Sequence, residues 1–113
     1  MHILDKPITK QALQELAKNS FGDMVKAVVD VKQQRMAIDA ELHSDLEAFL
    51  LENKSQQNDV WGINLYPALE GEALVEFDSM INMRPSQGNP SRGVDDSTLR
   101  DQIQKIVKKW VVE

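Results

Sequence analysis

The spacing of the apolar residues changes at about residue 22, and this change most constrains the fold. Between residues 9 and 18 the apolar side chains lie three and four positions apart, at Leu13, Leu16 and Ala17. This spacing predicts a helix with one apolar face, begun by Thr9 as its cap. From Val25 to Val31 every second residue is apolar, which predicts a half-buried strand. A helix followed by such a strand favours an α+β fold.

The strands continue beyond this point. Residues 32–35 form a polar turn and residues 36–38 resume the extended pattern, which predicts a β-hairpin without the usual Asn-Gly turn. Residues 60–66 predict another strand, ended by Pro67, and residues 74–84 a further one.

The segment 40–52 is ambiguous. The sequence Ser44-Asp45-Leu46-Glu47 fits a capping box and favours a short helix. The short apolar run at residues 49–51, bounded by a polar turn, favours a strand instead. We favour the strand, over residues 48–52.

A second amphipathic helix closes the chain. Asp95 or Asp96 caps it, and its apolar face consists of Leu99, Ile103, Ile106, Val107 and Trp110. These elements together predict that the whole chain, residues 1–113, forms one α+β domain. We expect a two-layer sandwich, with a mostly antiparallel sheet of four or five strands and both terminal helices on one face.

Composition excludes several classes of protein. The chain has no cysteine, so disulfides, thiolate metal sites and cysteine nucleophiles are excluded. It has no apolar run of the roughly 20 residues that a membrane helix needs, and its first residues lack the apolar run of a signal peptide, so a cytoplasmic location is expected. Its net charge of −5 argues against nucleic-acid binding.

The sheet face opposite the terminal helices mixes apolar and polar residues. It carries Val28, Asp30, Asn64, Tyr66, Asp78, Met80, Asn82 and Arg84. Such a face is typical of self-association or of a ligand groove, and we expect a homo-oligomer, with a dimer favoured. Asp78, Asn82 and Arg84 alternate along the expected strand 74–84, and a pair between Asp78 and Arg84 favours an interface. A catalytic role for Asp78 is the alternative.

The loop at residues 84–93 is the strongest candidate site. Its candidate ligand-binding residues are Arg84, Ser86, Gln87, Asn89, Ser91 and Arg92. Guanidinium groups match carboxylates and phosphates, so a small anion is the expected ligand. A surface loop whose arginines pair with Asp78, Asp95 or Asp96 is the competing interpretation, and it is slightly favoured.

His43 is the second candidate. In an extended segment Glu41, His43 and Asp45 would share one face, where they could bind a divalent metal or act as acid and base. A solvated connection is the favoured interpretation, and we assign no metal and no cofactor. The alternative function is a small hydrolase of anionic substrates, with His43 and Asp45 acting beside Arg84 and Arg92. We rank a binding or interaction function above catalysis, because the sequence shows no assembled nucleophile or metal cluster.

Three stretches are distinctive, at residues 21–30, 41–43 and 84–94, with the sequences FGDMVKAVVD, ELH and RPSQGNPSRGV. They resemble a small bacterial domain family of unknown function, and the resemblance covers nearly the whole chain. It implies a free-standing single-domain protein with no assigned activity. It supplies no catalytic residues.

Overall fold

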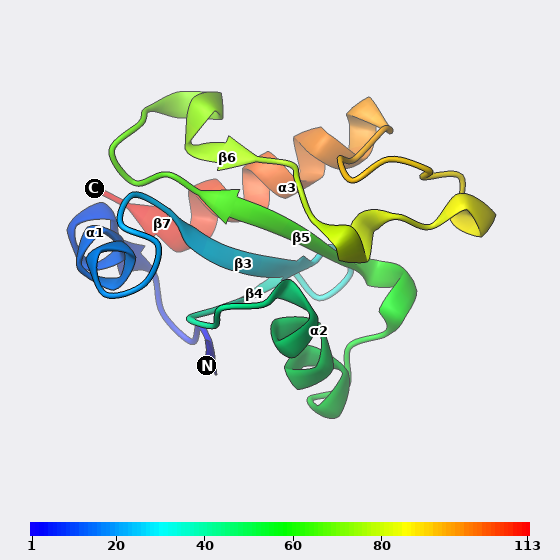
Figure 1. Cartoon of the computed structure of the whole chain (residues 1–113), viewed down its shortest axis with the longest axis horizontal. Coiled ribbons are helices and arrows are strands. Elements are labelled where there is room, and N and C mark those ends of the chain that lie inside the picture. Colours follow the sequence, from blue (N-terminus) through cyan, green and yellow to red (C-terminus); the bar gives the residue numbers. More distant parts are fainter.

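The computed structural model describes all 113 residues, which form an antiparallel sheet with helices on both of its faces (Figure 1). The helices are α1 (Lys10–Lys18), α2 (His43–Glu52) and α3 (Ser97–Trp110). The strands are β1 (His2–Ile3), β2 (Ile8–Thr9), β3 (Val25–Asp30), β4 (Arg35–Ile38), β5 (Val60–Leu65), β6 (Val75–Glu76) and β7 (Val111–Val112). Short 3₁₀ turns lie at Gln57–Asp59, Gly71–Leu74, Met80–Asn82 and Pro85–Gln87. No helix combines the length and the apolar character that a membrane crossing requires.

The sheet has the order β1-β4-β3-β5-β6, with all its neighbours antiparallel, and β2 and β7 form a separate parallel pair. The predicted α+β class and the hairpin are confirmed. The hairpin turn works without Asn-Gly because the buried carboxylate of Asp30 accepts from the backbone N–H groups of Lys32 and Gln33, both at 2.9 Å. Gln34 completes the turn with a positive φ of 55°.

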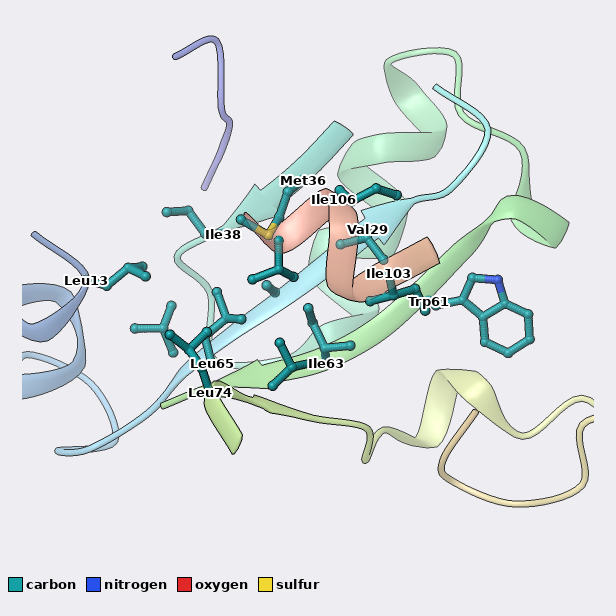
Figure 2. Packing of buried hydrophobic residues seen from close by; sticks show 14 of the residues in the cluster. Leu13, Val29, Met36, Ile38, Trp61, Ile63, Leu65, Leu74, Ile103 and Ile106 are labelled. Atoms are coloured by element: carbon teal, nitrogen blue, oxygen red, sulfur yellow. The ribbon is translucent and has the colours of Figure 1, made fainter. Parts of the chain in front are cut away.

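The main core lies between the sheet and the two terminal helices. Leu13 of α1 and Ile103 of α3 belong to one buried cluster with Val29 of β3 and Ile63 of β5. Figure 2 shows this cluster extending along the sheet, with Leu13 at one end and Trp61 at the other. The caps are those predicted: Thr9 Oγ1 accepts from Ala12 N at 3.1 Å, and Asp96 Oδ1 accepts from Thr98 N at 2.9 Å.

The predicted strand at residues 48–52 is wrong, because this segment is the second half of α2. Leu46 and Leu50 lie one helical turn apart and are fully buried, in a small cluster with Val28, Ala37 and Val60 on the second sheet face. A helix buries both leucines and leaves Leu51 outside, whereas a strand would have exposed alternate residues of the apolar run. Figure 1 shows α2 in front of the sheet and α3 behind it, so the second face is partly covered.

The predicted strand at residues 74–84 is also wrong beyond Glu76. After β6 the chain leaves the sheet, and the side chain of Asn82 takes the place of a paired strand. Its Oδ1 accepts from Gly62 N at 2.8 Å and its Nδ2 donates to Gly62 O at 2.9 Å. Asp78, Asn82 and Arg84 therefore do not alternate along one strand, because a buried amide satisfies the edge of β5 without one.

Candidate functional site

A pocket of about 540 Å³ opens on the second sheet face, where α2 begins and leaves the β5–β6 end uncovered. Four other pockets measure only about 180–230 Å³, so this one is the candidate site. Its floor comes from the sheet and its two walls come from the start of α2 and from residues 78–81 together with Arg92.

The floor is a row of polar side chains on three neighbouring strands. Lys26 of β3 pairs with Asn64 of β5, and Asn64 pairs with Glu76 of β6. Asn64 Nδ2 donates to Glu76 Oε1 at 2.8 Å, and the Tyr66 hydroxyl donates to the same oxygen at 3.2 Å. Asn64 is only 5% exposed, and its Oδ1 has no donor in the protein. The row places a cation at one end and a carboxylate at the other.

His43 stands on the α2 wall as the first residue of the helix, and it is almost completely buried. Its Nε2 lies 2.8 Å from the carbonyl oxygen of Ile63, so this nitrogen carries the proton and donates. The lone pair of the neutral ring is then on Nδ1. Burial lowers the pKa of His43 below its usual 6.5, although Ile63 O and Asp78 act in the opposite direction. The imidazole is therefore neutral at pH 7.

The start of α2 lacks the side-chain cap that the other two α-helices have. Leu42 occupies the N-cap position, and its side chain cannot accept a hydrogen bond. The backbone N–H groups of His43 and Ser44 have no acceptor in the protein, and both residues line the pocket. The positive end of the helix dipole thus faces the pocket.

The opposite wall is held by an ion pair and by close packing. Arg92 Nε donates to Asp78 Oδ1 at 2.6 Å, and both side chains are about half exposed. Ser79 N donates to Arg92 O at 2.9 Å, and Ser79 Oγ accepts from Ile81 N at 3.2 Å. These bonds tie residues 78–81 to Arg92 and to one another.

Arg84, the centre of the predicted anion site, is engaged elsewhere. Its guanidinium donates to the carbonyl oxygens of Ile81 at 3.0 Å, Gln57 at 2.9 Å and Val60. It also lies over the Trp61 ring, 4.5 Å from the centroid, and 3.7 Å from Glu47. Burial raises the pKa of Glu47 in spite of this cation, so desolvation outweighs the attraction between the two groups. Arg84 ties the loop to β5 and does not line the pocket.

The other polar groups of the loop mostly bind the protein itself. Buried Asn89 donates through Nδ2 to the carbonyls of Asn82 and Gly93, both at 2.8 Å, and its Oδ1 accepts from Asp95 N at 2.8 Å. Gln87 donates to Asn58 O at 2.9 Å and Ser91 donates to Asp95 at 2.7 Å, while Ser86 is exposed. Of the six predicted ligand residues, only Arg92 lines the pocket.

Residues 2–110 match the family model described as Protein of unknown function (DUF5674). The chain belongs to this family. The predicted membership in a family of unknown function is thereby confirmed. Comparison of the DUF5674 chain with curated proteins and with solved structures gave no match.

The structure of this DUF5674 protein brings together two of the three predicted catalytic residues. His43 and Asp78 line the pocket, whereas Asp45 is exposed on α2 and does not. His43 and Asp45 lie in a helix, where residues two apart diverge, and no group of three His, Asp or Glu side chains is placed to hold a metal ion.

Sequence reasoning missed most of the pocket residues. The missed residues that matter most are Lys26, Leu42, Ser44 and Glu76, whereas Asn64 was already expected on the sheet face opposite the terminal helices. The alternation in β3 does put Lys26 opposite the main core, but only the strand register shows that Asn64 and Glu76 continue its row. A leucine directly before a helix was the other available signal, and it required the correct helix start.

Proposed function

We propose that this DUF5674 protein binds a small ligand and holds an anionic group of that ligand at the N-terminus of α2. The observation that carries the proposal is the missing cap beside the pocket. A leucine in place of a capping Ser, Thr, Asp or Asn costs about 1 kcal/mol. It leaves the N–H groups of His43 and Ser44 free, and helix N-termini with free N–H groups are suited to anions.

Lys26 supports the same assignment. It lies in the pocket floor and makes no ion pair, and its Nζ lies over the Phe21 ring, 5.1 Å from the centroid. An unpaired ammonium in the same pocket as free helix N–H groups gives a local positive potential in a chain of net charge −5. The anion site therefore moves from the loop at residues 84–93 to the start of α2, with Arg92 at its far side.

Binding is favoured over hydrolysis by the state of His43. Its Nε2 proton is held by the Ile63 carbonyl, Asp45 lies outside the pocket, and the Cδ2 side of the ring faces Gly62, on the side where Ser79 also approaches this glycine. Nδ1 lies on the other edge of the ring, so Ser79 is not placed to be activated by His43.

The test follows backbone amides by NMR during titration with orthophosphate and with acetate at constant ionic strength. We expect saturable shifts of the His43 and Ser44 amides. Leu42→Asp should cap α2, raise the free energy of unfolding by about 1 kcal/mol and abolish the shifts. Leu42→Ala, the matched control, removes the leucine without supplying a cap and should keep them.

Two results would contradict the proposal. One is the absence of saturable shifts at His43 and Ser44 with either anion. The other is a stabilised Leu42→Asp variant that still binds orthophosphate as the wild type does, because the cap and the anion would compete for the same N–H groups.

A further inference from the structure

The pocket carries both signs of charge in equal number. Lys26 and Arg92 are its cations, Glu76 and Asp78 are its anions, and His43 is neutral at pH 7. A ligand that is only anionic would meet the helix N-terminus favourably but would also face two carboxylates. This balance disfavours a ligand that carries only negative charge and favours one with a donor or a cation elsewhere on the same molecule.

The carboxylates have acceptor capacity that the protein does not use. Glu76 accepts both of its hydrogen bonds at Oε1, so Oε2 has no donor in the protein. Asp78 accepts from Arg92 at Oδ1, and its Oδ2 is likewise free. The buried Oδ1 of Asn64 lies in the same floor and also lacks a donor. An unsatisfied buried acceptor costs about 1–3 kcal/mol, which a ligand donor would recover.

Apart from Arg92, which is paired with Asp78, the charged donors and the free acceptors lie on different sides of the pocket. Lys26 and Glu76 are separated by the intervening β5, so their Cα atoms are about 10 Å apart at ordinary strand spacing. The free N–H groups of α2 lie on the wall formed by residues 42–44, and Asp78 lies on the opposite wall. Opposite charges on one small molecule would match this separation.

The rim adds an apolar component. Leu42 is 54% exposed and Met80 is 65% exposed, and both line the pocket, one on each wall. Two large apolar side chains that are this exposed at the mouth of a polar pocket provide contact for an apolar part of a ligand.

We propose that the ligand is a small zwitterion with an apolar body, held with its carboxylate or phosphate against the start of α2 and Lys26 and its ammonium group against Glu76 and Asp78. The apolar body lies between Leu42 and Met80. This inference rests on the proposed function, because it takes the anion site at α2 as given and adds the cation site opposite.

The experiment uses two zwitterions of different charge separation, each with matched compounds that lack one charge. L-leucine is compared with N-acetyl-L-leucine and L-leucinamide, and 6-aminohexanoate with hexanoate and hexylamine, by calorimetry at pH 7. We expect at least one zwitterion to bind about tenfold more tightly than both of its matched compounds, since a hydrogen bond to a charged group contributes about 1.5–3 kcal/mol.

A charge-removing variant locates the cationic end. Glu76→Gln keeps an oxygen for the bonds from Asn64 and Tyr66 but removes the charge, so the fold is retained. It should weaken binding of the preferred zwitterion about tenfold and leave binding of its matched anion unchanged or stronger. Glu72→Gln, at an exposed position outside the pocket, is the control and should change neither affinity.

The outcomes separate the two proposals. If a matched anion binds as tightly as its zwitterion and shifts the His43 and Ser44 amides, the zwitterion inference is overturned and the proposed function stands. If a matched cation binds as tightly as its zwitterion, or Glu76→Gln leaves the preference intact, the inference is overturned as well. If no compound binds and no anion shifts these amides, both proposals fail.

Discussion

Gly62 is the position where a single methyl group should do most harm. A Cβ added there would lie 2.6 Å from Ser79 Cβ, 2.6 Å from Ser79 Oγ and 3.2 Å from His43 Cδ2. Gly62 has no positive φ, so the close approach of the pocket wall alone requires a glycine. We therefore predict that Gly62→Ala displaces Ser79.

The size of the effect follows from these distances. Carbon atoms in favourable contact are about 3.5–4.0 Å apart, so the new methyl group overlaps two atoms of Ser79 by about 1 Å. Ser79 cannot move freely, because its N–H donates to Arg92 O and its Oγ accepts from Ile81 N. Overpacking of a buried site costs about 1–3 kcal/mol, and we expect about 2–3 kcal/mol here.

The assay is urea unfolding at pH 7 with a double-mutant cycle. Ser79→Gly removes both clashing atoms, and by itself it should cost about 1–2 kcal/mol through the lost bond to Ile81 and the added flexibility. In the double variant the alanine has room, so the two costs should be non-additive by about 1 kcal/mol or more. Ser79→Ala keeps the Cβ contact and should rescue Gly62→Ala less.

Additivity within about 0.5 kcal/mol for Gly62→Ala with Ser79→Gly would refute this reasoning, because residues that do not clash show no coupling. Equal rescue by Ser79→Gly and Ser79→Ala would show that the Cβ contact is not the cause.

Further measurements test the interactions around the site. A lysine at position 84 cannot keep the three carbonyl bonds and the stacking on Trp61 that the guanidinium makes. Arg84→Lys should therefore lower the free energy of unfolding in urea by about 2–3 kcal/mol. An unchanged urea midpoint would contradict the role given to the guanidinium. Asn82→Ala leaves the N–H and C=O of Gly62 unpaired and should cost about 2–4 kcal/mol, with faster hydrogen exchange of the Gly62 amide as a second readout. The lowered pKa of His43 means that the unfolded chain binds a proton more readily than the folded chain. The contribution of His43 to stability is therefore fully present above pH 6.5 and is lost as the pH falls from 6.5 toward the folded-state pKa. The slope of unfolding free energy against pH should flatten in His43→Gln, and parallel slopes in the two proteins would show that His43 is not its cause. The expected homodimer remains a prediction, and sedimentation equilibrium tests it by the mass at high concentration.

Local sequence patterns were sufficient to predict the helices and strands whose apolar residues keep one spacing from end to end. The caps at Thr9 and Asp96 and the apolar faces behind them predicted α1 and α3, and alternation predicted the hairpin and β5. Burial on one side of these elements makes the period visible in the sequence.

The two wrong strands failed for different physical reasons. In α2 only Leu46 and Leu50 are fully buried in the small second core, and two such apolar positions are too few to distinguish a helix from a strand. In residues 77–84 the sequence still alternates, but the chain has left the sheet. It can do so because the side chain of Asn82 replaces a backbone partner of β5. A side chain that replaces a strand leaves no periodic pattern in the sequence, and only the tertiary structure reveals it.

The sequence by itself determined the α+β class, the two terminal helices and the central strands, because each buries one regular face. It also showed a cluster of polar and cationic groups at residues 84–93, but not which of them are free. The tertiary structure decided that Arg84 and Asn89 bind backbone carbonyls, and that Lys26, His43 and Glu76 meet in one pocket. A site is a set of groups left unsatisfied after folding, and which groups those are depends on the partners that distant parts of the chain supply.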